Sequence, residues 1–204
     1  MKLLGSPTSP YARKARIVII EKGLEDRVEI VAANPLGSDE DAAPLRAVNP
    51  VGKIPALVRD TGEALYDSPV ICEYLDHVGK GPALLPPAGE ARWTTLRRQA
   101  LGDGVADAAF SIVMELRRPE TERSADWQTR WLNIILRAAD AVEAELAQGD
   151  IGFDLGGLSL VSGFSYVAFR LPQIDWRAGR PRLTAWMATQ EARPSVAGTA
   201  PPTA

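Results

Sequence analysis

Apolar and polar positions alternate differently in the two halves of the chain. In the front half, short apolar stretches at residues 2–5 and 28–31 predict two β-strands. The residues between them follow a helical period, which predicts a helix opened by Ser9-Pro10 and closed by Lys22-Gly23. A strand, a helix and a second strand in this order form a β-α-β unit with a right-handed crossover.

The front half continues with two further strands and a helix. Apolar stretches at residues 54–59 and 63–66 flank Asp60-Thr61-Gly62, a composition typical of a short hairpin connection. Residues 68–76 then predict a helix with Ser68 as N-cap and Pro69 at its first position. Residues 32–48 are loop-like or weakly helical. The front half is therefore expected to form a small four-stranded sheet with helices.

Everything beyond residue 90 has a helical pattern. A linker rich in proline and glycine occupies residues 79–89. A long helix should follow and fade before Pro119, and a second should start at Ser124 or Asp126. A third is expected to open at Ser159, a fourth near Pro181, and residues 197–204 resemble a loose tail. The predicted domains are residues 1–78, a linker at 79–89, and an all-helical domain at 90–204.

Composition excludes several classes of protein. The 204 residues are 46% hydrophobic with a net charge of −3, which is typical of a globular protein and gives no reason to expect nucleic acid as a partner. No apolar run reaches the roughly 20 residues that span a bilayer. With one cysteine and one histidine, a disulfide framework and a metal centre are not expected. We therefore expect a soluble cytoplasmic protein without a membrane or metal association.

The candidate chemistry lies in residues 48–57 and in the Asp67-Ser68-Pro69 segment behind them. Pro55 stands where a strand should begin, a position that tolerates its missing N–H and allows a cis peptide bond at a cost of about 0.5–1 kcal/mol. A cis bond there would leave the N–H and C=O of Ile54 free to pair with a peptide-like ligand. The helix start at Ser68 favours an anion. Together these features predict a site for a small anionic peptide.

The order of elements and four motifs resemble the cytosolic glutathione transferases. The motifs are Ser9-Pro10-Tyr11, Asn49 to Pro55, Asp67-Ser68 with Glu73-Tyr74-Leu75, and the late Ser159-Leu160. The resemblance, to a bacterial type with a serine at the thiol-activating position, covers nearly the whole chain. It implies an α/β thioredoxin-like N-terminal domain followed by an all-α C-terminal domain. It also implies a homodimer and glutathione as the ligand and co-substrate.

The resemblance assigns roles to individual residues of the front half. Pro55 is similar to the family's cis-proline, and Ile54 to the residue whose backbone pairs with the cysteinyl part of glutathione. Asp67 and Ser68 match the pair that holds the γ-glutamyl end. Lys53 is placed to attract the glycyl carboxylate.

Two further roles follow from the same resemblance. Ser9 lies where the family keeps its thiol-activating residue, with Thr8 and Ser6 as alternatives for the same role. Asp103, in the long helix, matches acidic residues that reach the ammonium of glutathione across the dimer interface in some members. A helix cap alone at Ser9 and a surface charge at Asp103 are the simpler interpretations.

The implied activity is a glutathione transferase that acts in detoxification. Ser9 would stabilise the thiolate of glutathione, which is then transferred to a hydrophobic electrophilic small molecule. Alternatives on the same fold are a non-catalytic or regulatory glutathione-binding protein and an isomerase, dehalogenase, ether-cleaving or peroxidase variant. The first helix lacks the Cys-x-x-Cys of redox relatives, which argues against thiol–disulfide exchange.

The late helix departs from the family pattern. Ser159 is followed at the third position by Ser162, not by the aspartate of a capping box, and then by Gly163. A serine caps less well than a carboxylate, and a glycine inside a helix costs about 0.5–1 kcal/mol relative to alanine. We therefore expect this helix to reduce the stability of the fold.

Overall fold

The computed structural model describes residues 1–202, which form two compact units. The first unit comprises Met1–Pro87 together with the segment from Pro194 onward, and the second comprises Ala88–Arg193. The C-terminal segment is thus grouped with the front half, whereas the predicted boundary assigns it to the helical domain. In the part of the chain that the structure describes, no helix is long and apolar enough to cross a membrane.

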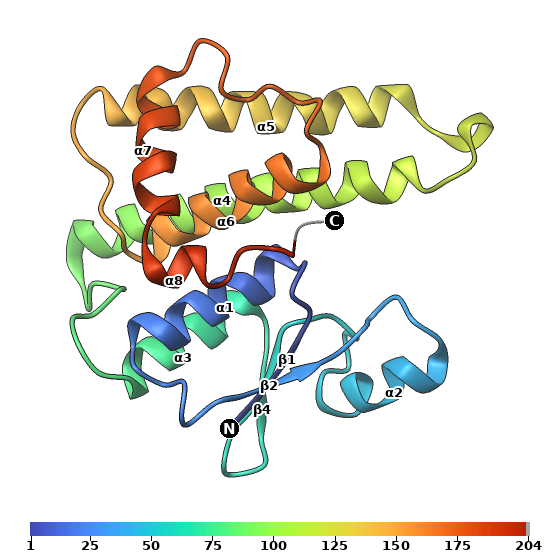
Figure 1. Ribbon diagram of the computed structural model, residues 1–204, viewed down its shortest axis with the longest axis vertical. Coiled ribbons are helices and arrows are strands. Elements are labelled where there is room, and N and C mark those ends of the chain that lie inside the picture. The colour runs from blue at the N-terminus through green and yellow to red at the C-terminus, as the bar shows by residue number, and fades with distance from the viewer. Residues whose placement is uncertain (203–204) are drawn as a thin grey trace. The chain divides into compact units, whose positions relative to one another are not determined.

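The first unit has a four-stranded mixed sheet, as predicted (Figure 1). Its strand order is β2-β1-β3-β4, with β1 parallel to β2 and β3 antiparallel to both β1 and β4. This is the thioredoxin-like arrangement. The elements are β1 (Lys2–Gly5), α1 (Pro10–Glu21), β2 (Glu29–Ala32), α2 (Asp39–Val48), β3 (Ala56–Val58), β4 (Ala64–Leu65), α3 (Ser68–Val78) and α8 (Pro194–Ala197).

The two faces of the sheet are covered by different helices. A Cβ added at Gly5 would lie 2.9 Å from the Cβ of Ala12, so α1 approaches β1 closely on that face. Leu4, the preceding residue of β1, packs instead with Leu45 of α2 and Ala56 of β3. Because successive residues of a strand point to opposite faces, α1 and α2 lie on opposite sides of the sheet. Helix α3 contacts both α1 and β3.

The helix starts of this unit confirm one prediction and correct two. Ser9 is the N-cap of α1, and its hydroxyl accepts the N–H of Ala12 at 3.2 Å. Helix α3 begins one residue earlier than expected, since Asp67 is its N-cap and Ser68 its first residue. Residues 39–48, predicted as loop-like or weakly helical, form a complete helix. Ser38 and Asp41 explain it, because they make a reciprocal capping box.

The start of the predicted loose tail at residues 197–204 is anchored instead, because Ala197 ends α8 and Thr199 is buried. Residues 194–197 form α8, which packs against α1. The Nη2 of Arg13 donates to the carbonyl of Val196 at 3.0 Å, and the hydroxyl of Ser195 donates to the carboxylate of Glu21. Val196 and Thr199 are buried. These long-range contacts have no local sequence signal, and the last two residues of the predicted tail lie outside the described residues.

The second unit is helical, as predicted. The long helix α4 fades before Pro119 as expected, and Ser124 caps α5 by accepting the N–H of Trp127. Helices α5 and α6 both pack against α4, and α7 contacts α5 and α6 (Figure 1). The elements are α4 (Gly89–Leu116), η1 (Glu120–Glu122), α5 (Ala125–Leu146), α6 (Leu155–Arg170) and α7 (Pro181–Glu191).

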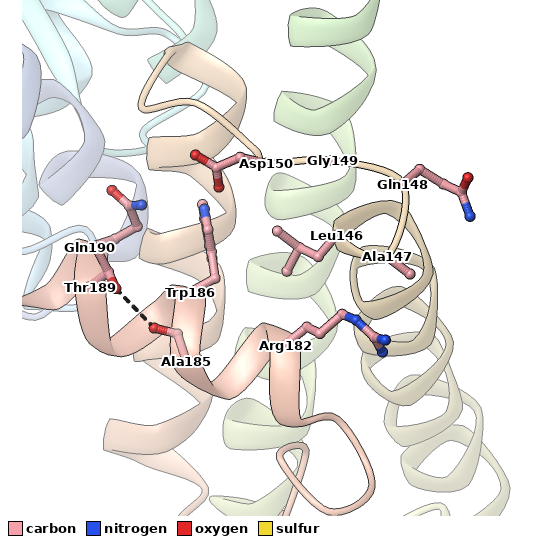
Figure 2. A pocket seen from close by; sticks show the side chains of 10 residues that line it. All are labelled: Leu146, Ala147, Gln148, Gly149, Asp150, Arg182, Ala185, Trp186, Thr189 and Gln190. Atoms are coloured by element: carbon pink, nitrogen blue, oxygen red, sulfur yellow. Dashed lines mark hydrogen bonds between the residues drawn. The ribbon is translucent and has the colours of Figure 1, made fainter.

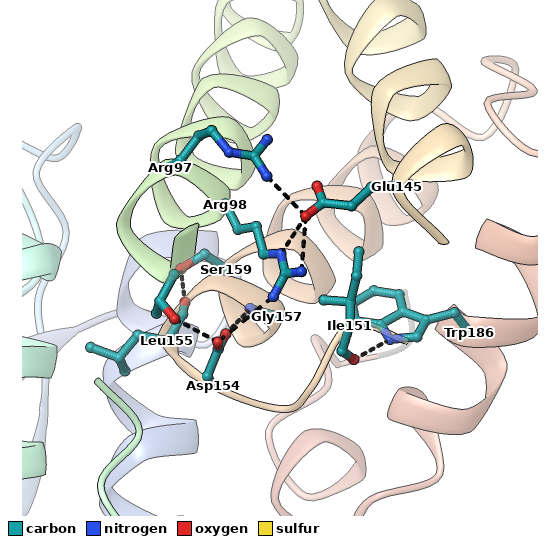
Figure 3. A network of polar contacts seen from close by, with 10 residues as sticks. Arg97, Arg98, Glu145, Ile151, Asp154, Leu155, Gly157, Ser159 and Trp186 are labelled. Carbon is teal, nitrogen blue, oxygen red and sulfur yellow. Dashed lines mark hydrogen bonds and ion pairs between the residues drawn. The ribbon is translucent and has the colours of Figure 1, made fainter. Parts of the chain in front are cut away.

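The prediction that α6 opens at Ser159 is wrong. Asp154 is the N-cap, and its carboxylate accepts the N–H of Gly157 at 2.8 Å and the hydroxyl of Thr95 at 2.6 Å (Figure 3). Ser159 lies inside the helix and donates to the carbonyl of Leu155 at 2.7 Å. Since a carboxylate caps this helix, the expected weak cap does not exist. Gly156 and Gly157 belong to its first turn.

The cap of α6 is tied into a polar network shared with α4 and α5. Arg98 pairs with Glu145 of α5 at 2.8 Å and approaches Asp154 at 3.9 Å, and Arg97 also pairs with Glu145 at 2.8 Å (Figure 3). Trp186 of α7 donates its indole N–H to the carbonyl of Ile151 at 2.8 Å. The loop before α6 is therefore held by contacts from α4 and α7, and Glu145 of α5 pairs with the arginine that reaches Asp154.

Candidate functional site

Three predicted segments meet at one end of the sheet. Because β3 runs antiparallel to β1 and β4, its start lies at the same end as the close of these two strands. Ser9 follows β1, Ile54 and Pro55 precede β3, and Asp67 and Ser68 follow β4. Strand topology alone therefore gathers the predicted site residues of the first unit at one end of the sheet.

Ile54 presents an unpaired backbone at this end. The Ile54–Pro55 peptide is cis, as predicted, and β3 begins only at Ala56. Within residues 1–202, neither the N–H nor the C=O of Ile54 makes a backbone hydrogen bond. Its side chain packs against the cluster of Leu4, Leu45 and Ala56, which anchors the residue. The peptide groups remain available as a donor and an acceptor for an extended ligand.

Asn49 shapes the loop before Ile54, a role that sequence reasoning missed. The side chain is buried, donates from Nδ2 to the carbonyl of Lys53 at 2.7 Å, and accepts the N–H of Val51 at 3.0 Å. Gly52 has a φ of 67°, a conformation that favours glycine. The Asn-Pro-x-Gly composition predicts a turn, but the hydrogen bond from Asn49 to the carbonyl of Lys53 is visible only in the structure.

The N-terminus of α3 is suited to an anion. Asp67 makes no side-chain cap hydrogen bond, so the first-turn N–H groups of α3 receive no acceptor from their N-cap. Ser68 is only 2% exposed, whereas the side chains of Asp67 and Lys53 are exposed. The helix dipole and the N–H groups of Ser68 and Val70 favour a carboxylate here. Lys53 adds a positive charge in the segment before β3.

Ser9 is half-buried at the N-terminus of α1. Its hydroxyl oxygen accepts the N–H of Ala12, so the hydroxyl proton remains available for a second bond. Among the described residues, no acceptor for this proton is present. Thr8 and Ser6, the alternatives, are likewise half-buried in the loop between β1 and α1.

The remaining features of interest lie in the second unit. Asp103 is half-buried on α4. A pocket between the end of α5, the loop that follows it, and α7 has none of the predicted site residues in its lining (Figure 2). Its polar lining groups include Asp150, Arg182 and Gln190, and Arg182 already pairs with Glu143 at 3.2 Å. We assign no function to this pocket.

Comparison with known proteins identifies the family. A model of the glutathione S-transferase N-terminal domain matches residues 8–78. The chain is 35% identical over 207 aligned residues, covering 100% of both chains, to the "Uncharacterized GST-like protein YibF" of Escherichia coli (strain K12). The chain belongs to the glutathione S-transferase family.

Solved structures agree with this assignment. A glutathione transferase family member from Pseudomonas fluorescens Pf-5 with bound glutathione superposes with a TM-score of 0.91 at 38% identity, covering 99% of each chain. A glutathione S-transferase from Methylobacillus flagellatus KT, also with glutathione, gives a TM-score of 0.91 at 38% identity, covering 98% of this chain and 99% of the other.

Proposed function

We propose that this protein binds glutathione, stabilises its thiolate and transfers it to an electrophilic small molecule. The observation that carries the proposal is the bound glutathione in the two solved relatives, which match this chain over nearly its whole length. The site residues named above supply the chemistry that such a ligand requires. The same resemblance supports a cytoplasmic homodimer that acts in detoxification, with Asp103 near the glutathione of the partner subunit.

The proposed binding mode uses the end of the sheet. The backbone of Ile54, next to Pro55, pairs with the cysteinyl part of glutathione. Ser68 and the free N–H groups of α3 hold the γ-glutamyl carboxylate, and Asp67 lies near its ammonium. Lys53 attracts the glycyl carboxylate. Among the described residues, the backbone of Ile54 makes no hydrogen bond that a ligand would have to displace, and the first turn of α3 has no side-chain cap. The side chains of Lys53 and Asp67 are exposed and can reorient toward a ligand.

The proposed chemistry depends on the charge of the sulfur. A free thiol has a pKa of about 8.5, so only a few per cent is thiolate at neutral pH. A hydrogen bond from the Ser9 hydroxyl and the N-terminus of α1 both favour the charged form. The thiol proton leaves to solvent, the sulfur forms a bond to the electrophilic carbon, and the leaving group departs with its electron pair. Lowering the pKa of the thiol by one unit requires that the site stabilise the thiolate over the thiol by about 1.4 kcal/mol.

The proposal is tested first by isothermal titration calorimetry with glutathione and by a panel of electrophiles. We expect saturable binding of glutathione and conjugation with at least one electrophile class. Binding without turnover would instead indicate a non-catalytic glutathione-binding protein. No binding would contradict the proposal altogether.

Replacing Ser9 by alanine should slow conjugation while leaving glutathione affinity within about threefold. The variant removes one hydrogen bond to the thiolate, which is worth about 1.5–3 kcal/mol when one partner is charged, so the pKa of the bound thiol should rise. The measurement is the pH dependence of kcat/KM together with the ultraviolet absorbance of the thiolate. Ser124→Ala is the matched control, because it removes the same kind of helix cap from α5. Unchanged kinetics for Ser9→Ala would assign the role to Thr8, Ser6 or a backbone N–H.

Replacing Ser68 by alanine should weaken glutathione binding more than Ser9→Ala does. Ser68 is buried at the helix start and is proposed to contact the ligand carboxylate directly, so its loss should raise the Kd about tenfold. Calorimetry on both variants gives the order. If Ser9→Ala has the larger effect on Kd, the proposed binding mode is wrong.

A further inference from the structure

Asn49 is a buried polar residue at the end of α2, just before the segment that leads to Ile54. It is 2% exposed and serves as the C-cap residue of α2, with its backbone N–H donating to the carbonyl of Leu45 at 2.8 Å. The preceding residue, Val48, packs against the same apolar cluster that anchors the side chain of Ile54. The place of Asn49 is therefore set by a helix and by the apolar core of the first unit.

Both ends of the Asn49 side-chain amide have a partner in this segment. The Oδ1 atom accepts the N–H of Val51 at 3.0 Å, and Nδ2 donates to the carbonyl of Lys53 at 2.7 Å. An N–H requires an acceptor and a carbonyl requires a donor, so these partners determine which end of the amide faces Lys53. Aspartate has the same shape as asparagine but no donor when it is ionised, so at position 49 it would keep only the bond to Val51.

The hydrogen bond to Lys53 also determines the direction of a neighbouring donor. The carbonyl of Lys53 and the N–H of Ile54 belong to one planar peptide group, which is trans, so the two point in opposite directions. A bond that holds the carbonyl toward Asn49 therefore holds the N–H of Ile54 away from it. Within residues 1–202 this N–H makes no backbone hydrogen bond. A hydrogen bond at the carbonyl polarises the peptide group and strengthens its N–H as a donor.

The rest of the segment does little to hold this peptide group. The side chain of Lys53 is exposed, and β3 begins only at Ala56, so sheet pairing does not reach the peptide. The backbone of Gly52, immediately before it, has a φ of 67° and carries no side chain that could pack. Without the amide of Asn49, water would compete for the carbonyl and the peptide plane could rotate.

We infer that Asn49 is a positioning residue for the ligand, because its amide turns the peptide between Lys53 and Ile54 so that the N–H of Ile54 points at the cysteinyl carbonyl of glutathione. The inference rests on the proposed function, which supplies the ligand. Asn49 acts through Ile54 and needs no contact with glutathione itself. Its effect should therefore appear in the one ligand bond that the N–H of Ile54 makes.

The test begins with Asn49→Asp, which keeps the size of the side chain and the acceptor for Val51. The donor is replaced by a carboxylate oxygen, which repels the carbonyl of Lys53. Calorimetry at pH 8, about four units above the usual pKa of an aspartate, should show the Kd for glutathione raised about tenfold. Asn34→Asp is the matched control, because Oδ1 of Asn34 accepts the N–H of Leu36 at 3.1 Å in a similar turn. The control makes the same change of charge and should leave the Kd within about twofold.

A second ligand separates positioning from a general loss of structure. In this analogue of glutathione an (E)-alkene replaces the Cys–Gly peptide bond, so the shape, the thiol and both carboxylates remain but the cysteinyl carbonyl is gone. The wild-type protein should bind glutathione about five- to tenfold more tightly than the analogue. In Asn49→Asp this ratio should fall to within about twofold, because the N–H of Ile54 no longer points at the carbonyl. An unchanged Kd for glutathione would overturn the inference, as would an equal loss of affinity for both ligands.

Two further experiments cover misfolding and a failure of the proposed function. If Asn49→Asp does not fold, Asn49→Ser takes its place, because its shorter hydroxyl side chain can still accept the N–H of Val51, and a preserved ratio again overturns the inference. Crystal structures of the ligand-free wild type and variant should show the carbonyl of Lys53 turned away from residue 49 in the variant. If the wild type binds no glutathione, the proposed function fails and these structures decide: a turned carbonyl supports the orienting role of Asn49, and an unmoved one overturns it.

Discussion

Replacing Asp76 by asparagine is expected to lower the free energy of unfolding by about 3–5 kcal/mol, because it leaves the charge of Lys22 buried without its counterion. The Nζ of Lys22 lies 2.9 Å from Oδ1 of Asp76, and the two side chains are 2% and 7% exposed. A charge in such surroundings needs an opposite charge and hydrogen bonds to offset the cost of removing it from water. The measurement is urea-induced unfolding of the variant and the wild type.

The pair also holds the segment that follows α3. The carboxylate of Asp76 accepts the N–H groups of Leu84 and Leu85 at 2.9 and 3.0 Å. Lys22 donates to the carbonyl of Pro82 at 2.9 Å. Removing the negative charge therefore weakens hydrogen bonds to the backbone as well as the ion pair, since hydrogen bonds to charged groups are the stronger kind.

An exposed ion pair of the same unit supplies the control. Lys2 and Glu29 lie 3.5 Å apart with side chains 61% and 63% exposed. Glu29→Gln should cost less than about 1 kcal/mol, because water screens the pair. Replacing both buried partners, with Lys22→Met and Asp76→Leu, should recover part of the stability lost in Asp76→Asn. A cost for Asp76→Asn no larger than that for Glu29→Gln would refute this account of the buried pair.

Replacing Gly163 or Gly102 by alanine should lower the stability by about 1–3 kcal/mol or more, although alanine is the better helix former. A Cβ at Gly163 would lie 2.5 Å from the carbonyl oxygen of Gly102. One at Gly102 would lie 2.4 Å from the backbone carbon of Ser159. Both contacts are with backbone, so the helices themselves would have to separate.

Gly104 is the matched control on the same helix as Gly102. A Cβ there meets nothing within 4 Å, so Gly104→Ala should raise the stability by about 0.5–1 kcal/mol. Thermal and urea-induced unfolding of the three single variants tests the opposite signs. If Gly163→Ala is as stabilising as Gly104→Ala, the close approach of α4 and α6 is wrong.

These glycines show where a local argument leaves out a tertiary contact. In an isolated helix, a glycine at position 163 would lower helix stability relative to alanine. In the structure the missing side chain permits α6 to pack directly on α4. Likewise, Ser159 resembled a helix cap, but the N-cap is Asp154. The hydroxyl of Ser159 donates a hydrogen bond to the carbonyl of Leu155 inside the helix. Local pattern could not distinguish a serine before a helix from one inside it.

The sequence by itself determined the order of the main elements and the Ser9 cap of α1, and it allowed the cis peptide before Pro55 that the family resemblance implied. These depend on period, on caps and on the chemistry of proline, which act between residues close together in the chain. Only the tertiary structure showed that Asn49 hydrogen-bonds to the carbonyl of Lys53, that Lys22 pairs with Asp76 and that α8 packs against α1. No local sequence preference specifies any of these contacts. In the ion pair and in the packing of α8, the partners are also far apart in sequence. Their energies come from burial, which exists only once the chain has folded.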